Sequence, residues 1–205
     1  TQQNLHLELD ATQGALDFAH HFVAPISYQQ LNATVDFSFV EEGWELSVND
    51  IALVSDEVSL TADLAMGFLK GNETNMSLLA NITEVDVSNI GLYYPLTSMS
   101  NSLVSYLNNA LIDGKVTQAQ VLLNGPLARF PFIENEGVFI VNAELEEASF
   151  QFDEQWPSIT AFAANLNFTN NSMLITGRSG NLVGLDVSGV QAAIDDLGSE
   201  QILVL

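Results

Sequence analysis

The chain has 205 residues, 47% of them hydrophobic, and its 26 acidic residues against four Lys and Arg give a formal net charge of −22. Repulsion from phosphate at this charge argues against nucleic-acid binding, and docking on anionic lipid surfaces is disfavoured for the same reason. The absence of cysteine excludes disulfides, thiolate nucleophiles and cysteine-based zinc sites.

The length predicts a single unit over residues 1–205, with a division into 1–92 and 93–205 as the alternative. The hydrophobic content is sufficient for a core, yet no run reaches the roughly 20 apolar residues that a membrane-spanning helix needs. The sequence begins with polar "TQQN" instead of Met and ends on apolar "QILVL". We therefore expect a piece of a longer protein.

Strict alternation of apolar and polar residues, typical of strands with one buried face, dominates the N-terminal part of the chain. Apolar residues occupy every second position within residues 5–9, 31–39, 44–48, 58–66 and 76–82. Short turn sequences such as "EEG" and "KGNET" separate neighbouring segments. The pattern predicts antiparallel strands joined by hairpins.

Helical spacing replaces the alternation in residues 93–114. The apolar positions there are Leu96, Met99, Leu103, Tyr106, Leu107, Ala110 and Leu111. Pro95 suits a first helical turn and Gly114 suits a C-terminal stop. This predicts one main amphipathic helix near residues 95–112. We expect its apolar stripe to pack on the sheet. A helix on a membrane surface would carry Lys or Arg, and none lies between the ends of this one.

Alternation resumes after Val116. It covers residues 119–123, 139–145, 148–152, 162–168 and 173–175. We expect 148–152 to form a partner strand of 139–145, and residues 182–197 to form a strand that ends in a short helical turn. Hairpins stacked with their apolar faces aligned predict a mainly β fold: an elongated, strongly curved antiparallel sheet that forms an open β-groove.

No residue pattern indicates catalysis or a cofactor. The three histidines lack metal-ligand spacing, no serine stands in a nucleophile-elbow motif, and the acidic clusters lack calcium-loop spacing. We therefore predict no enzyme activity and no cofactor, although adventitious Ca²⁺ binding stays open. The 12 phenylalanines, which alternate along strands, fit either a closed core or an apolar groove for acyl chains.

A succession of short motifs lies within residues 103–168. In chain order they are "YLNNAL", "GKV", "NGPLARFPF", "GVF", "ASFQF", "WP" and "LNF". This succession resembles the periplasmic region of the YhdP proteins, in the AsmA-like superfamily, over about residues 90–190. The FPF element followed by WP carries most of the specificity. The segment "VLLNG" departs from the pattern, in which an aromatic residue is expected before the glycine.

The resemblance implies a large Gram-negative envelope protein, anchored in the inner membrane by a segment absent here. Its periplasmic β-groove would carry phospholipids toward the outer membrane, with acyl chains and adjacent segments of the same chain as partners. Phe130 and Phe132, held by Pro131, would then join one hairpin to the next and line the groove. The alternative function is a structural or adhesive β-module that binds proteins or Ca²⁺.

The remaining groove candidates come from alternate positions on four predicted strands. Together with the FPF pair, the candidate lipid-groove residues are Leu31, Val35, Phe37, Leu60, Leu64, Phe130, Phe132, Phe139, Val141, Phe162, Leu166 and Phe168. Because alternate side chains of a strand project to the same side, each set should share one face.

Overall fold

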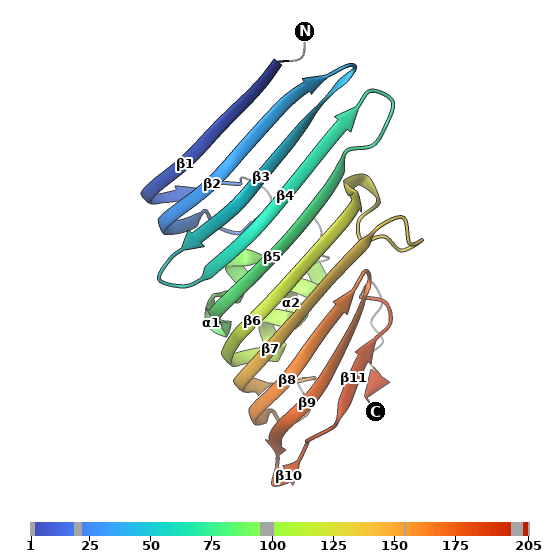
Figure 1. The fold of residues 1–205 in the computed structure, drawn as a ribbon. Helices are drawn as coiled ribbons and strands as arrows, with labels where there is room; N and C mark the ends of the chain where they lie inside the picture. The colour runs from blue at the N-terminus through green and yellow to red at the C-terminus, as the bar shows by residue number, and fades with distance from the viewer. Residues whose placement is uncertain (1–2, 19–21, 95–100, 154, 198–202, 205) are drawn as a thin grey trace.

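One long antiparallel sheet contains every strand of the described residues (Figure 1). The computed structural model describes residues 3–18, 22–94, 101–153, 155–197 and 203–204. The strands of the first part are β1 (Gln3–Leu16), β2 (Ile26–Val40), β3 (Gly43–Val54), β4 (Ser59–Leu69) and β5 (Asn75–Asp86). Those that follow are β6 (Leu111–Pro126), β7 (Val138–Phe150), β8 (Ile159–Thr169), β9 (Ser172–Leu182), β10 (Leu185–Asp186), β11 (Gln191–Ile194) and β12 (Leu203–Val204).

The sheet is a meander, in which each strand from β1 to β9 pairs with the next along the chain. β11 follows beside β9, β12 beside β11, and the short β10 also pairs with β9. β1 and β12 lie at opposite edges and do not pair, so the sheet is open. The predicted mainly β fold with an open antiparallel sheet is confirmed.

The apolar positions of two strands change between even and odd residue numbers part-way along the strand. At these points a bulge keeps the apolar side chains on one face. On β3 the register shifts between Val48 and Ile51, around Asp50 at φ 53°. On β7 it shifts between Leu145 and Ala148, with Glu147 at φ 52°. A bulge adds one residue to one strand, so the following side chains return to the same face.

The bulge at Glu147 explains one wrong prediction. Residues 148–152 were expected to turn back on 139–145, but β7 runs without reversal from Val138 to Phe150. A change of parity looks the same in the sequence whether the chain bulges or turns. The expected helical turn in residues 182–197 is also wrong, because Gln191–Ile194 forms β11 against β9.

The helical segment connects β5 to β6 and lies against one face of the sheet (Figure 1). It comprises α1 (Val87–Ile90), η1 (Gly91–Tyr93) and α2 (Asn101–Ala110); a further short helix, η2 (Leu127–Arg129), follows β6. α1 was not predicted, although Asp86 caps it by accepting a hydrogen bond from the Ser88 amide at 2.9 Å.

The predicted helix over 95–112 is shorter at its C-terminal end, because Leu111 already begins β6. Gly114 is not a helix stop but a strand residue at φ 127°, where a Cβ atom would stand 2.6 Å from the Ala148 Cα. Of the predicted stripe, Leu107 and Ala110 are buried. Leu96, Met99 and the side chain of Leu103 lie outside the described residues.

The β9–β10 hairpin has a strained residue at its tip. Val183 and Gly184 both adopt positive φ, 51° and 88°, as a two-residue type I′ turn requires. Asn or Gly normally occupies the first of these positions, and a β-branched residue there is an outlier. The Val183 side chain is 76% exposed, so little packing compensates for the strain.

We expect Val183→Asn to raise the free energy of unfolding by about 1 kcal/mol, because relief of such a conformation is worth roughly 1–3 kcal/mol. Urea denaturation of the two proteins measures the change. Val183→Ala is the control, since alanine stays unfavourable at positive φ and should gain less. An Asn variant no more stable than the Ala variant would show that the turn stores no strain.

Candidate functional site

One face of the sheet is apolar from edge to edge; we call it the apolar face. Residues that stand directly opposite one another on successive strands form continuous rows across it. The longest row, from β1 to β11, is Ala11, Leu31, Leu53, Leu60, Ile82, Ala119, Ala143, Leu166, Ile175 and Ala192. Side chains opposite one another in neighbouring strands lie about 4.5–5.5 Å apart, so each row is a band of contacting hydrocarbon.

Two further rows run beside the first, nearer the β2–β3 turn. One contains Leu7, Val35, Val48, Leu64, Leu78, Leu123 and Phe139. The other contains Leu5, Phe37, Leu46, Met66 and Met76, and it ends at Gly125 on β6. The sequence-based candidates omitted β1, β3, β5, β6 and β9, although the same period-2 alternation marks their apolar residues.

The opposite face, which we call the polar face, carries many amides and acids, and the exposed leucines Leu79, Leu122 and Leu174 lie among them. Asn81, Gln120, Asn142 and Asn167 form one of its rows. Within that row Gln120 Nε2 donates to Asn81 Oδ1 at 3.1 Å and Asn167 Nδ2 donates to Asn142 Oδ1 at 2.6 Å. The two faces therefore differ in their side chains: continuous apolar rows on one, and polar rows with hydrogen-bonded amides on the other.

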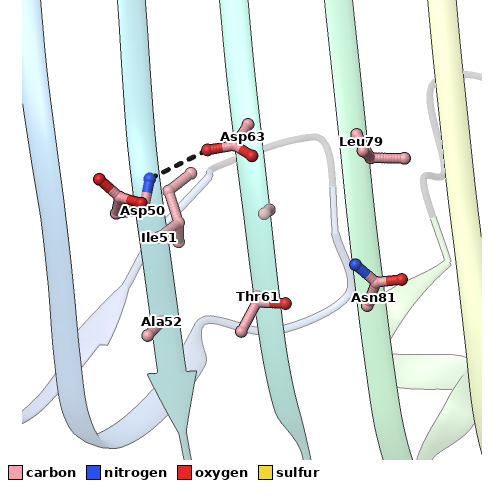
Figure 2. Close-up of a pocket in the computed structure, with 8 residues that line it drawn as sticks. Asp50, Ile51, Ala52, Thr61, Asp63, Leu79 and Asn81 are labelled. Carbon is pink, nitrogen blue, oxygen red and sulfur yellow. Dashed lines mark hydrogen bonds between the residues drawn. The ribbon is translucent and has the colours of Figure 1, made fainter.

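A shallow hollow of about 300 Å³ lies on the polar face beside the β3 bulge (Figure 2). Figure 2 shows Asp50 and Asp63 at one side of it and Leu79 and Asn81 at the other. The Asp50 amide donates to Asp63 Oδ1 at 3.0 Å, which holds the bulge in place. Carboxylates in the wall make this hollow unsuitable for a hydrocarbon chain.

The candidate residues share the apolar face but differ in accessibility. Four of the candidates are buried: Leu31, Phe132, Phe162 and Leu166. The other eight are partly accessible: Val35, Phe37, Leu60, Leu64, Phe130, Phe139, Val141 and Phe168. A bound hydrocarbon chain can touch only side chains of the second group directly.

Phe132 is the most buried aromatic residue of the FPF element, with 0% of its surface exposed. Its ring lies over Gly125 of β6 and over Gly137, which precedes β7: a Cβ atom would stand 2.8 Å from Phe132 Cε1 at Gly125 and 2.7 Å from it at Gly137. The Phe130 ring packs edge-on against Phe132 at 5.7 Å and against Phe139 at 5.1 Å. These glycines make room for the ring on the apolar face.

Asn170, in the turn between β8 and β9, fixes the FPF segment from the neighbouring hairpin. Its Nδ2 donates to the Phe132 carbonyl at 3.1 Å, and its Oδ1 accepts from the Phe139 amide at 2.8 Å. On the other side, Arg129 Nε donates to Glu73 Oε1 at 3.0 Å. The FPF segment thus links the β4–β5, β6–β7 and β8–β9 turns, which is how it joins one hairpin to the next.

The titratable groups form no catalytic arrangement in the part of the chain that the structure describes. His6 Nδ1 donates to Asp36 Oδ1 at 2.6 Å on the exposed surface, and this hydrogen bond raises the pKa of His6. Burial raises the pKa of Tyr94 and of Tyr106 to about 12, so both stay neutral phenols. Among the described residues, no group of three or more His, Asp or Glu side chains could hold a metal ion.

No helix within the described ranges combines the length and hydrophobicity needed to cross a membrane.

Two comparisons with known proteins gave matches. The family model of the YhdP protein matches residues 1–205. The chain is 27% identical over 202 residues to the Escherichia coli (strain K12) "Intermembrane phospholipid transporter YhdP". The match covers 98% of this chain and 16% of that protein, so the chain spans about a sixth of the relative's length. No solved structure matches.

Proposed function

Because the chain belongs to the YhdP family, we propose that its apolar face binds the acyl chains of phospholipids and conducts these lipids between membranes, without chemical reaction. The chain would act as one segment of a periplasmic protein that an additional segment anchors in the inner membrane. Adjacent segments of the longer protein would pair with the sheet edges and extend the apolar face on both sides.

The observation that carries this proposal is the set of uninterrupted apolar rows on an open sheet. A closed sheet or a second packed layer would remove such rows from any ligand, whereas here many of their side chains are partly accessible. Withdrawing apolar surface from water is favourable by about 25 cal/mol of free energy per Å². A hydrocarbon chain can therefore bind such a face without any polar partner. Large contiguous apolar surfaces on soluble proteins usually mark binding sites.

The acidity of the protein supports transport over stable membrane attachment. A net charge of −22 repels anionic lipid surfaces, while the polar face keeps the molecule in water. Lipid tails would contact the apolar face, whereas the negative charge of the protein would repel an anionic bilayer surface.

Native mass spectrometry and organic extraction of the purified chain test the proposal. Co-purified phospholipid, displaced by mild detergent, is the expected result. Thermal melting with and without Ca²⁺ tests the alternative function, a structural or adhesive β-module that binds proteins or Ca²⁺. A lipid-free protein whose melting temperature depends on calcium would favour that alternative. A lipid-free chain that also takes up no phospholipid from vesicles would refute lipid binding by this segment.

A further inference from the structure

Within the proposed function, on which this inference rests, the structure assigns the acyl chains to one part of the apolar face. We propose that they lie on the portion of β1–β5 nearest the β2–β3 turn, and not along the whole sheet. This area, the open strip, consists of Leu5, Leu7, Val35, Phe37, Leu46, Val48, Leu64, Met66, Met76 and Leu78. Each of the five strands contributes two residues to it.

Burial separates the open strip from the rest of the face. None of its ten side chains is buried, and Leu5 and Leu7 are 60% and 49% exposed. Where the two rows of the strip reach β6 they close: Leu123 is 8% exposed, and Gly125 lies under the ring of Phe132, which is 0% exposed. A tail can therefore reach the strip on the first five strands, whereas β6 offers it no accessible apolar side chain in the same two rows.

Two elements close the face beyond β5. The segment from α1 to α2 replaces a short hairpin turn between two paired strands, and it packs Val87, Leu107 and Ala110 into the core. The Gln151 amide donates to the Ala110 carbonyl at 2.8 Å, which ties the end of α2 to the end of β7. At the opposite strand ends, Phe132 covers the β6–β7 glycines. Phe132 thus ends the strip at β6, whereas the α1–α2 segment lies at the opposite ends of β5 and β6.

The dimensions of the open strip suit one hydrocarbon tail. Five strands at 4.7–4.9 Å spacing span about 19 Å from β1 to β5. One leaflet contributes about 15 Å of hydrocarbon to a bilayer core of roughly 30 Å. A tail of that length laid across the five strands would contact apolar side chains along its whole length.

An aromatic cluster borders the open strip and provides a reporter. Trp44 stacks on Phe37 with ring centroids 6.0 Å apart, and Phe37 packs edge-on against Phe39 at 4.9 Å. The other tryptophan, Trp156, is 50% exposed and lies in the connection between β7 and β8, at the opposite strand ends. A lipid held on the strip should touch Trp44 and not Trp156.

Fluorescence quenching by phosphatidylcholine with brominated acyl chains measures this contact. In the Trp156→Phe protein, where Trp44 is the only tryptophan, tryptophan emission excited selectively should fall strongly relative to unbrominated lipid. In the Trp44→Phe protein, emission from Trp156 should stay unchanged. Equal quenching of both tryptophans, or quenching of Trp156 alone, would place the lipid elsewhere and overturn the assignment.

A pair of charge variants gives a second readout. Leu64→Glu places a carboxylate in the middle of the open strip, whereas Leu79→Glu places it on the polar face of the neighbouring strand. We expect the first to lose bound phospholipid and the second to keep it, with both folded by circular dichroism. If the unaltered chain takes up no lipid, the proposed function itself fails. If Leu64→Glu retains lipid, the strip is wrong and the proposed function stands.

Discussion

Phe132→Ala is expected to lower the free energy of unfolding by about 3–5 kcal/mol, which is the usual cost of truncating a fully buried phenylalanine. The ring is 0% exposed and fills the space above Gly125 and Gly137, which have no side chains of their own to fill it. Its removal would leave a cavity between rigid backbones, and the edge-on contact with Phe130 would be lost. Denaturant unfolding followed by circular dichroism measures the loss.

Phe39→Ala is the matched control for this variant. Phe39 also packs edge-on against another phenylalanine, yet it is 55% exposed. Its truncation should cost much less than that of Phe132, because most of the ring already meets water. Equal losses in the two variants would show that the FPF element does not anchor the β6–β7 connection.

The side of the sheet on which a residue lies could be predicted from the sequence. Side chains alternate along any strand, so Val35 and Leu64 had to lie on the face defined by their own apolar neighbours. The register then placed the two residues in one row. Burial could not be predicted in this way. Leu166 and Val35 occupy equivalent positions in the alternation, yet only Leu166 lies where other parts of the chain cover the face.

The bulges and the role of the FPF element also escaped prediction, for different reasons. At Glu147 a change of parity between Leu145 and Ala148 had two possible causes, and only the strand pairing distinguishes them. The FPF motif was conspicuous in the sequence, but Phe132 depends on glycines of two paired strands that accept its ring. Contacts between segments distant along the chain set that environment, and local patterning does not encode them.

Leu166→Asp and Val35→Asp are expected to separate the closed part of the apolar face from its open part. An unpaired charge in a closed core costs several kcal/mol, against a total stability of about 5–15 kcal/mol for a typical domain. Leu166 is 9% exposed, so its aspartate should unfold the chain or lower its melting temperature severely. Val35 is partly accessible and water can solvate an aspartate there, so the protein should stay folded and lose phospholipid binding.

Asn81→Asp supplies the control for both variants, because it adds the same charge on the polar face and keeps the acceptor for Gln120 Nε2. It should change neither the melting temperature nor lipid uptake appreciably. Melting curves and phospholipid uptake from vesicles, measured on all three proteins, decide the matter. Unfolding by Val35→Asp would mean that the apolar face is closed over β2 as well. A folded Val35→Asp protein with undiminished uptake would mean that lipid tails do not pass Val35, because a carboxylate in their path must either be desolvated or exclude them.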